Sequence, residues 1–216
     1  MKEFTVKVTL LEEMLGTTSS NPKLQEEFVA SKILEQKNLK TLDISAEEAN
    51  KRIDEEMEVV NEDAVGDVTI GKTIFPKLED GTPFMWDYQF KGFFKDACQM
   101  MKKVSGSESA KIKAFKKEID GLIFVSPRKI PIILPEGGKI GDCQRPLRAS
   151  TPMGERVALA NSETVPAGST MEFKVQCLVD SDFKAVLEWL EYGKLRGLGQ
   201  WRNSGAGRFE YDIIDG

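Results

Sequence analysis

The sequence contains no histidine among its 216 residues. Histidine is the usual general base near neutral pH and the commonest protein ligand of metal ions. Its absence therefore excludes Ser-His-Asp and Cys-His nucleophilic sites. Carboxylate or lysine catalysis stays open in principle, but no closely spaced acidic pair stands within an apolar motif. We therefore expect a protein that binds and does not catalyse, with no cofactor and no metal site.

Cysteine is also scarce. Cys98, Cys143 and Cys177 are odd in number, far apart and not arranged as Cys-x-x-Cys. This pattern argues against a disulfide framework and against a cysteine-based zinc site. The sequence instead predicts buried, reduced thiols.

Long apolar segments and nucleotide-binding loops are absent as well. No run reaches the ~18 apolar residues that a membrane span needs. The first six residues alternate like a strand and do not open an apolar secretory segment, so we expect a cytoplasmic chain with no membrane partner. Neither the Gly-Lys-Ser/Thr ending of a Walker loop nor a Gly-x-Gly-x-x-Gly fingerprint after a strand occurs. Nucleotide hydrolysis is therefore not expected.

The net charge of −5 is unevenly distributed. Residues 43–63 contain nine acidic residues and only two basic ones, Lys51 and Arg52. The sequence Ser45-Ala46-Glu47-Glu48 has the pattern of a capping box before a helical apolar periodicity. We predict that residues 17–80 form an acidic, largely helical insertion. Its charge fits the solvated face of an amphipathic helix, and the alternative interpretation is acidic mimicry of nucleic acid.

Apolar periodicity predicts the remaining elements. Alternation predicts strands at residues 4–10, 171–179 and 209–213, and helical spacing predicts one helix from Phe90 and another that is capped by Asp180 or Ser181 and carries its apolar positions from Phe183 onward. A short helix is expected after Ser107, followed by strands at 121–125 and 130–134, where Pro131 favours an edge position. The glycine- and proline-rich stretch up to Gly154 predicts no regular element. The order indicates one α+β domain over residues 1–216, ferredoxin-like (RRM-like) βαββαβ, with helices on one face of an antiparallel sheet.

The loop before the last predicted strand is unusually rich in glycine and cations. From Lys194 to Arg208 the chain has four cations and no acid. Glycine permits positive φ and close approach to a ligand, so these amides could face a phosphate while the arginines supply charge. The structural alternative is a tryptophan that covers the local core and arginines that hydrogen-bond the loop. The candidate residues in this loop are Gly199, Trp201, Arg202, Gly205, Gly207 and Arg208.

Four segments, in order, resemble motifs of the RAMP superfamily, the repeat-associated proteins of CRISPR effector complexes. Residues 90–95, Phe-Lys-Gly-Phe-Phe-Lys, resemble its apolar-Lys-Gly helix motif. Residues 145–148 with 158–163 resemble the segment before its central strand, and residues 165–173 resemble its Pro-Ala-Gly step into that strand. Residues 198–208 are similar to its C-terminal glycine-rich signature.

The resemblance implies a ribonucleoprotein subunit of antiviral defence. Its partners would be single-stranded guide RNA and other CRISPR effector subunits, with self-association along the RNA. Basic side chains and loop amides would contact phosphates, and an aromatic side chain would be available to stack on a base. RNA-processing members commonly use a histidine, so its absence here favours a non-catalytic role. The implied RNA-binding residues are Lys91, Lys95, Arg145, Arg148, Gly199, Trp201, Arg202, Gly205, Gly207 and Arg208.

Two other functions stay open. The same fold could be a viral or mobile-element mimic that binds an effector complex and inhibits it, an option that the acidic segment favours. A metal-dependent ribonuclease could use aspartates such as Asp43, Asp87 or Asp142, although no spacing among them supports a metal site.

Overall fold

The computed structural model describes residues 1–20, 72–151 and 154–215. Most of the predicted insertion, including its acidic segment, lies outside these residues. The chain divides into two compact units. Unit 1 comprises Met1–Leu15, Thr82–Gly141 and Thr164–Gly216, and unit 2 comprises Gly16–Gly81 and Asp142–Glu163.

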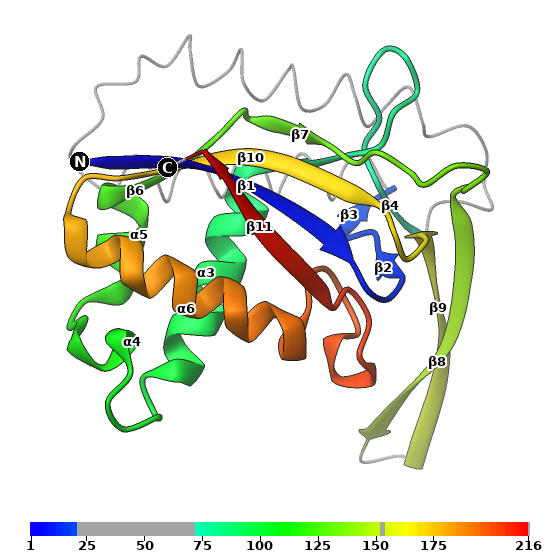
Figure 1. Cartoon of the computed structure of the whole chain (residues 1–216). Helices are drawn as coiled ribbons and strands as arrows, with labels where there is room; N and C mark the ends of the chain where they lie inside the picture. The colour runs from blue at the N-terminus through cyan, green and yellow to red at the C-terminus, as the bar shows by residue number, and fades with distance from the viewer. Residues whose placement is uncertain (21–71, 152–153, 216) are drawn as a thin grey trace, which may run out of the picture. The chain divides into compact units, whose positions relative to one another are not determined.

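Unit 1 is built on a four-stranded antiparallel sheet in the order β11-β1-β10-β6 (Figure 1). These strands are β1 (Lys2–Leu10), β6 (Ile123–Ser126), β10 (Thr170–Cys177) and β11 (Phe209–Asp215). Alternate side chains of β1 are buried, beginning with Phe4 and ending with Leu10. The strands predicted from period-two alternation are therefore confirmed.

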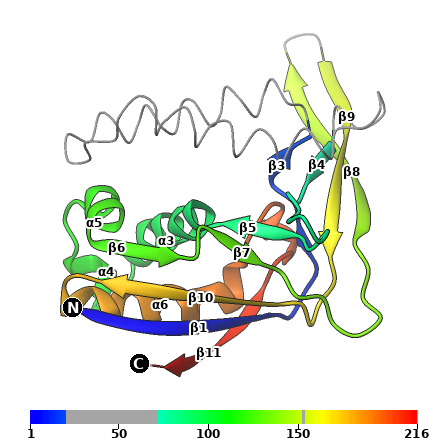
Figure 2. The same ribbon diagram turned by 90° about the horizontal axis from the view of Figure 1, so that it is seen from above.

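Two long helices cover one face of this sheet, α3 (Asp87–Met101) and α6 (Asp180–Arg196) (Figure 2). The ring of Phe90 lies 4.2 Å from that of Phe173 on β10, and the ring of Phe94 lies 5.6 Å from that of Trp189 on α6. These aromatic contacts join both helices to the sheet. The predicted α+β class is confirmed.

The segment between α3 and β6 differs from the prediction. The single short helix expected after Ser107 is two helices, α4 (Glu108–Lys111) and α5 (Phe115–Leu122). The chain turns between them because Ile112 is extended, with φ −81° and ψ 115°, and buries its side chain. Residues 121–122, expected in a strand, complete α5, which runs directly into β6.

Two smaller strand pairs complete unit 1. β5 (Phe84–Trp86) pairs with β7 (Lys129–Pro131), where Pro131 stands opposite Phe84 in this two-stranded sheet. The edge position expected for Pro131 is confirmed. β2 (Met14–Leu15) pairs with Thr164 and Val165, the last two residues of β9.

Unit 2 contains a long hairpin that the sequence did not predict. β8 (Gly141–Thr151) pairs with β9 (Gly154–Val165), and β9 pairs in parallel with β4 (Lys72–Ile74), which pairs with β3 (Thr18–Ser19). The sequence of β8 is polar and interrupted by Pro146, so it lacks the apolar alternation that identifies a half-buried strand.

None of the helices in the described residues is long and apolar enough to span a membrane.

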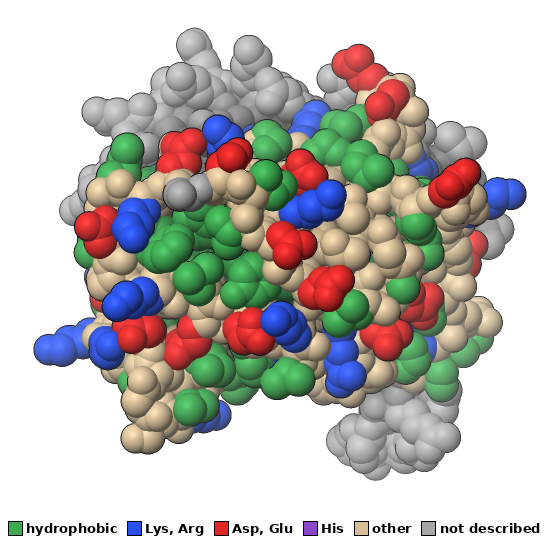
Figure 3. All heavy atoms as spheres, viewed as in Figure 1, with side chains coloured by type: hydrophobic (Ala, Val, Ile, Leu, Met, Phe, Trp, Pro, Cys, Tyr) green, Lys and Arg blue, Asp and Glu red, His purple; other side chains and the backbone are tan. Residues whose placement is uncertain are grey.

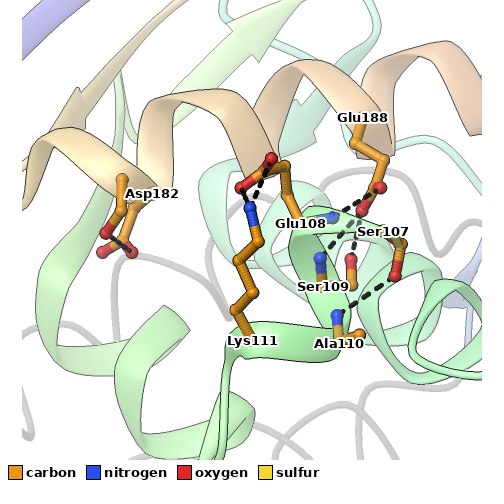
Figure 4. A network of polar contacts seen from close by, with 8 residues as sticks. Ser107, Glu108, Ser109, Ala110, Lys111, Asp182 and Glu188 are labelled. Carbon is orange, nitrogen blue, oxygen red and sulfur yellow. Dashed lines mark hydrogen bonds and ion pairs between the residues drawn. The ribbon is translucent and has the colours of Figure 1, made fainter. Parts of the chain in front are cut away.

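A carboxylate from α6 fixes the position of α4 (Figure 4). Glu188 accepts hydrogen bonds from the backbone amides of Glu108 at 2.9 Å and Ser109 at 3.0 Å, and from the Ser109 hydroxyl. The Ser109 hydroxyl also accepts a bond from the indole nitrogen of Trp189, at 2.8 Å. The first amides of a helix have no partner within it, so Glu188 caps α4 from outside. A helix of four residues depends on such external bonds.

Replacing Glu188 with Ala should lower the free energy of unfolding by about 2–3 kcal/mol, because two amides and a hydroxyl lose a charged acceptor. Urea unfolding followed by tryptophan fluorescence measures this change. The matched control is Glu191→Ala on the same helix, whose exposed carboxylate pairs with Lys194 at 2.9 Å. Its effect should stay below about 0.5 kcal/mol. Equal effects of the two substitutions would contradict the capping role.

Candidate functional site

The glycine-rich loop of residues 198–208 joins α6 to β11 in unit 1. The amide of Leu198 donates to the carbonyl of Gly207 at 2.8 Å, which closes the loop at its base. The amide of Gly207 donates to the carbonyl of Glu13, also at 2.8 Å, which ties the loop to the segment between β1 and β2. A short 3-10 helix, η2 (Arg202–Ser204), forms its tip.

The loop glycines permit close backbone packing. Gly207 has a φ of +71°, and a Cβ there would collide with the backbone of Leu198. A Cβ at Gly199, whose φ is +75°, would lie 2.7 Å from the carbonyl oxygen of Leu15. The amides of Gly205 and Gly207 already donate within unit 1, to Arg202 and Glu13. Folding of the loop accounts for these glycines, and these two amides are occupied by protein carbonyls.

The two loop arginines differ in their surroundings. Arg202 donates from Nη1 to the Asp96 carboxylate on α3 at 2.7 Å, and Arg196 donates to the same oxygen from Nε at 3.3 Å. Arg208 is exposed and donates from Nε to the carbonyl of Leu195 at 3.1 Å. Asp96 therefore offsets charge at Arg202, whereas Arg208 keeps its full charge at the surface.

Trp201 has an unusual backbone. Its φ is +56° and its ψ is +30°, and it is the one non-glycine residue with positive φ in the described part of the chain. Bulky residues rarely adopt this left-handed conformation, which costs of order 1–3 kcal/mol. Two bonds from Ser204 to the carbonyl of Trp201 hold the turn, at 3.0 Å from the amide and 2.7 Å from the hydroxyl. The side chain is 47% exposed, so burial in the core does not explain the strain.

Lys91 and Lys95 face a different side of α3, towards α5. Lys95 pairs with the Asp120 carboxylate at 2.6 Å, and Lys91 donates to the Asp120 carbonyl at 3.1 Å. Partial burial lowers the pKa of Lys91, and the nearby charge of Asp120 opposes that shift. The structure therefore does not bring these lysines together with Arg202, which contacts α3 through Asp96, or with Arg208, which contacts the carbonyl of Leu195 on α6.

Gly92 lies between these lysines on an exposed part of α3. A Cβ built on Gly92 would meet no atom within 4 Å. Glycine in a helix interior costs about 1 kcal/mol relative to alanine, and nothing in this packing requires it. Residues four apart share a helix face, so Gly92 lies one turn before Asp96, which binds Arg202. This uncovered backbone beside the loop is the feature most suited to close approach of a ligand.

Arg145 and Arg148 belong to unit 2, on β8. Arg145 is buried, with 7% of its surface exposed. The side chain of Arg148 lies outside what the structure describes. Their contact with RNA stays a prediction, as does that of the loop and helix residues.

The central strands β1 and β10 offer no stacking platform on the open face of the four-stranded sheet, where the exposed aromatic residue is Phe124 of the edge strand β6. The outward side chains of β1 and β10 include Lys7, Glu172 and Lys174, and no outward residue of these central strands is aromatic. Lys7 pairs with Glu172 at 3.5 Å, and Lys174 pairs with Glu3 at 3.2 Å. On the face of the molecule seen in Figure 3, basic and acidic side chains are likewise interspersed. Paired charges of both signs do not favour a polyanion there.

The aspartates considered for metal catalysis have other contacts or are not described. Asp87 lies 3.6 Å from Nη1 of Arg128, Asp142 forms an ion pair with Lys72, and Asp43 is outside the described residues. Within residues 1–20, 72–151 and 154–215, no group of three or more Cys, Asp or Glu side chains is placed to hold a metal ion.

No protein-family model matches the sequence, and a search of curated proteins finds no match. Solved structures share the fold. One is a chain of the Type III-B Cmr-beta complex, determined by cryo-EM with cognate target RNA bound, with a TM-score of 0.51 and 12% identity over 99% of this chain. Another comes from a Type IV-B CRISPR complex, with a TM-score of 0.50 and 11% identity. It covers 99% of this chain and 90% of that one.

The present chain spans 61% of the length of the Cmr-beta chain. At these identities the likeness is one of fold. It extends over nearly the whole chain.

Alanine should have opposite effects on the free energy of unfolding at Gly207, which has positive φ, and at Gly92, which lies in helix α3. Gly207→Ala should destabilise the protein by about 1–3 kcal/mol or more, because it forces a side chain into a left-handed backbone. Gly92→Ala should stabilise it by up to about 1 kcal/mol, because alanine favours the helix and meets open space. Thermal and urea unfolding of both variants measure the changes. A destabilised Gly92→Ala would show that Gly92 has a packing role after all.

Proposed function

We propose that the chain is a non-catalytic RNA-binding subunit of a CRISPR-type ribonucleoprotein complex and contacts guide-RNA phosphates. Two independent observations support this proposal. The fold is like that of subunits in Type III-B and Type IV-B complexes, and the four RAMP-like segments occur in order along the sequence. The strand order β11-β1-β10-β6, with α3 and α6 on one face, supports a ferredoxin-like βαββαβ assignment for unit 1. Residues 17–80 are then an insertion.

The observation that carries the binding site is the conformation of Trp201. Its backbone lies in the left-handed region while its indole is half exposed, and residues held in such strained conformations cluster at functional sites. An aromatic ring at a loop tip, next to Arg202 and near exposed Arg208, can stack on a base while the cations contact the flanking phosphates. Stacking is tolerant of sequence, as a guide-binding subunit requires.

The uncovered backbone at Gly92 extends this site onto α3. An RNA strand that passes the loop tip can approach the helix closely there, because no side chain intervenes. For Lys91 and Lys95, contact with RNA requires a phosphate to replace Asp120 as their partner. Arg145 and Arg148 are proposed contacts from unit 2. Other effector subunits, and further copies of this chain along the RNA, are the proposed protein partners.

Replacing Trp201 with Ala should weaken binding of a labelled single-stranded RNA by about 5- to 150-fold, because a stacked base contributes about 1–3 kcal/mol. Replacing Arg202 and Arg208 together with Ala should lower the slope of log affinity against log salt by about 1.4, since each phosphate contact on a single strand contributes ~0.7. Fluorescence anisotropy between 50 and 300 mM salt measures both.

The control for these variants is Lys7→Ala with Lys174→Ala, which removes two cations from the open sheet face. Its affinity should stay within about twofold of the parent chain, because distant exposed charges are screened. The proposal would be contradicted if the parent chain bound no RNA at 50 mM salt, either alone or within its native complex. Loop variants that bind like the control would remove the loop from the site.

A second candidate function is favoured by a specific observation. The charge of Arg202 is already offset by Asp96, and the charges on the open sheet face are paired. Both features fit an inhibitory mimic, which takes the position of a subunit in the effector complex and binds no RNA. An inhibitory mimic of this kind should associate with effector proteins in a way that survives ribonuclease. Deleting residues 43–63 should abolish that association. Size-exclusion chromatography of the purified components, with and without ribonuclease, distinguishes the two functions. A guide-binding subunit should dissociate from the effector proteins when the RNA is digested, whereas an inhibitory mimic should stay bound.

A further inference from the structure

The strongest concentration of positive charge lies outside the residues assigned to the proposed site. Residues 102–117, which follow α3 and include all of α4 and the start of α5, contain six lysines and one acid, Glu108, in a chain whose net charge is −5. Five of these lysines are exposed. We call them the lysine ridge: Lys103, Lys111, Lys113, Lys116 and Lys117.

Internal contacts gather the ridge at one end of unit 1. Lys102 donates from Nζ to the carbonyls of Ile112 at 2.7 Å and Lys113 at 3.3 Å, which joins the end of α3 to the turn between α4 and α5. Glu188 fixes α4 against α6. These contacts hold together the turn after α3, helix α4 and the turn before α5, and the ridge lysines on these elements and at the start of α5 are up to 14 positions apart in sequence.

Nearby carboxylates leave most of this charge unbalanced. Glu108 pairs with Lys111 at 2.7 Å, Glu118 accepts from the amide of Ala114 at 3.1 Å, and Asp120 pairs with Lys95. Lys103, Lys113, Lys116 and Lys117 form no ion pair within the part of the chain that the structure describes.

Helix stability does not explain where these lysines lie. Lys116 and Lys117 occupy the first turn of α5, where the helix dipole disfavours cations. Glu118 in the same turn is the residue type that the dipole favours, so the two lysines add nothing to the stability of α5.

The chemistry of the ridge fits nucleic-acid phosphate better than a protein surface. Lysine is depleted at the cores of protein interfaces, which favour aromatic residues, methionine and arginine. Apart from Val104, the exposed side chains of residues 103–117 are charged, polar or small. Lysine ammonium groups act as point charges on flexible stems, which suits backbone contact without recognition of bases.

We propose that the lysine ridge is a second binding surface for the phosphate backbone of RNA, on elements separate from the loop at residues 198–208. The inference rests on the proposed function for the identity of the polyanion. It extends that function by giving the subunit two contacts with RNA, one that stacks a base and one that is purely electrostatic. The electrostatic contact should tolerate any sequence and should weaken steeply with salt.

The test replaces Lys113, Lys116 and Lys117 with Ala in the full chain. All three are exposed, and alanine favours the first turn of α5, so the variant should unfold no more easily than the parent. Anisotropy with a labelled 30-nucleotide single-stranded RNA should show binding at least about fivefold weaker, with the salt slope lowered by about 2. The matched control removes the same net charge elsewhere in unit 1, at Lys7, Lys139 and Lys174, and should stay within about twofold.

Each outcome decides a separate point. If the ridge variant and its control bind RNA with the same affinity, the proposal that the lysine ridge binds RNA is wrong. This holds even if the Trp201 and Arg208 variants weaken binding and so support the loop. A weakened ridge variant beside unaffected loop variants keeps the ridge and removes the loop from the proposed function. A parent chain that binds no RNA overturns both. Unlabelled polyglutamate should displace the labelled RNA less effectively than unlabelled RNA of equal charge. Equal displacement by the two competitors would show that the ridge binds acidic proteins, and RNA would then be wrong as its ligand.

Discussion

The aromatic packing of α3 against the sheet is the constraint on which the other features depend. Phe90 and Phe94 contact rings from β10 and α6, which fixes the rotation of α3 about its axis. With that rotation fixed, Gly92 must face solvent and Asp96 must face the loop, where it holds Arg202. The exposed side of α3 is therefore decided by its buried side, and a shift of one residue in the helix register would change both.

The glycine-rich loop shows that one composition can serve two purposes. Its glycines let the backbone pass close to Leu198 and Leu15, and two of their amides are bonded to protein carbonyls. A phosphate-binding loop needs amides that point to solvent. Here the glycines build a tight support, and the support holds Trp201 outward. A phosphate could use the amides of Gly205 and Gly207 only by displacing these carbonyls.

Much of unit 1 could be predicted because its sequence patterns arise from burial. Phe4, Val6 and Val8 alternate because one face of β1 is covered, and Phe90, Phe93 and Phe94 follow helical spacing because one side of α3 is covered. The β8–β9 hairpin escaped prediction because its sequence is polar. The partners of Lys95 and Arg202 could not be foreseen either, since Asp120 and Asp96 reach them only through tertiary packing. The lysine ridge was visible in the sequence as a charge run, but only the structure shows which of its cations are unbalanced.

Local charge balance, more than the number of cations, decides where a polyanion can bind this protein. An arginine already paired with a carboxylate gains less from a phosphate, because the phosphate must displace that partner or bind against its repulsion. Arg202, Lys95 and Lys111 are in this position, whereas Arg208 and the other four lysines of the ridge are not. The segment that most resembles a known motif and the segment with the most unbalanced charge are therefore different parts of unit 1. An RNA that used both would gain specificity of position from the stacked tryptophan and most of its salt-dependent affinity from the ridge.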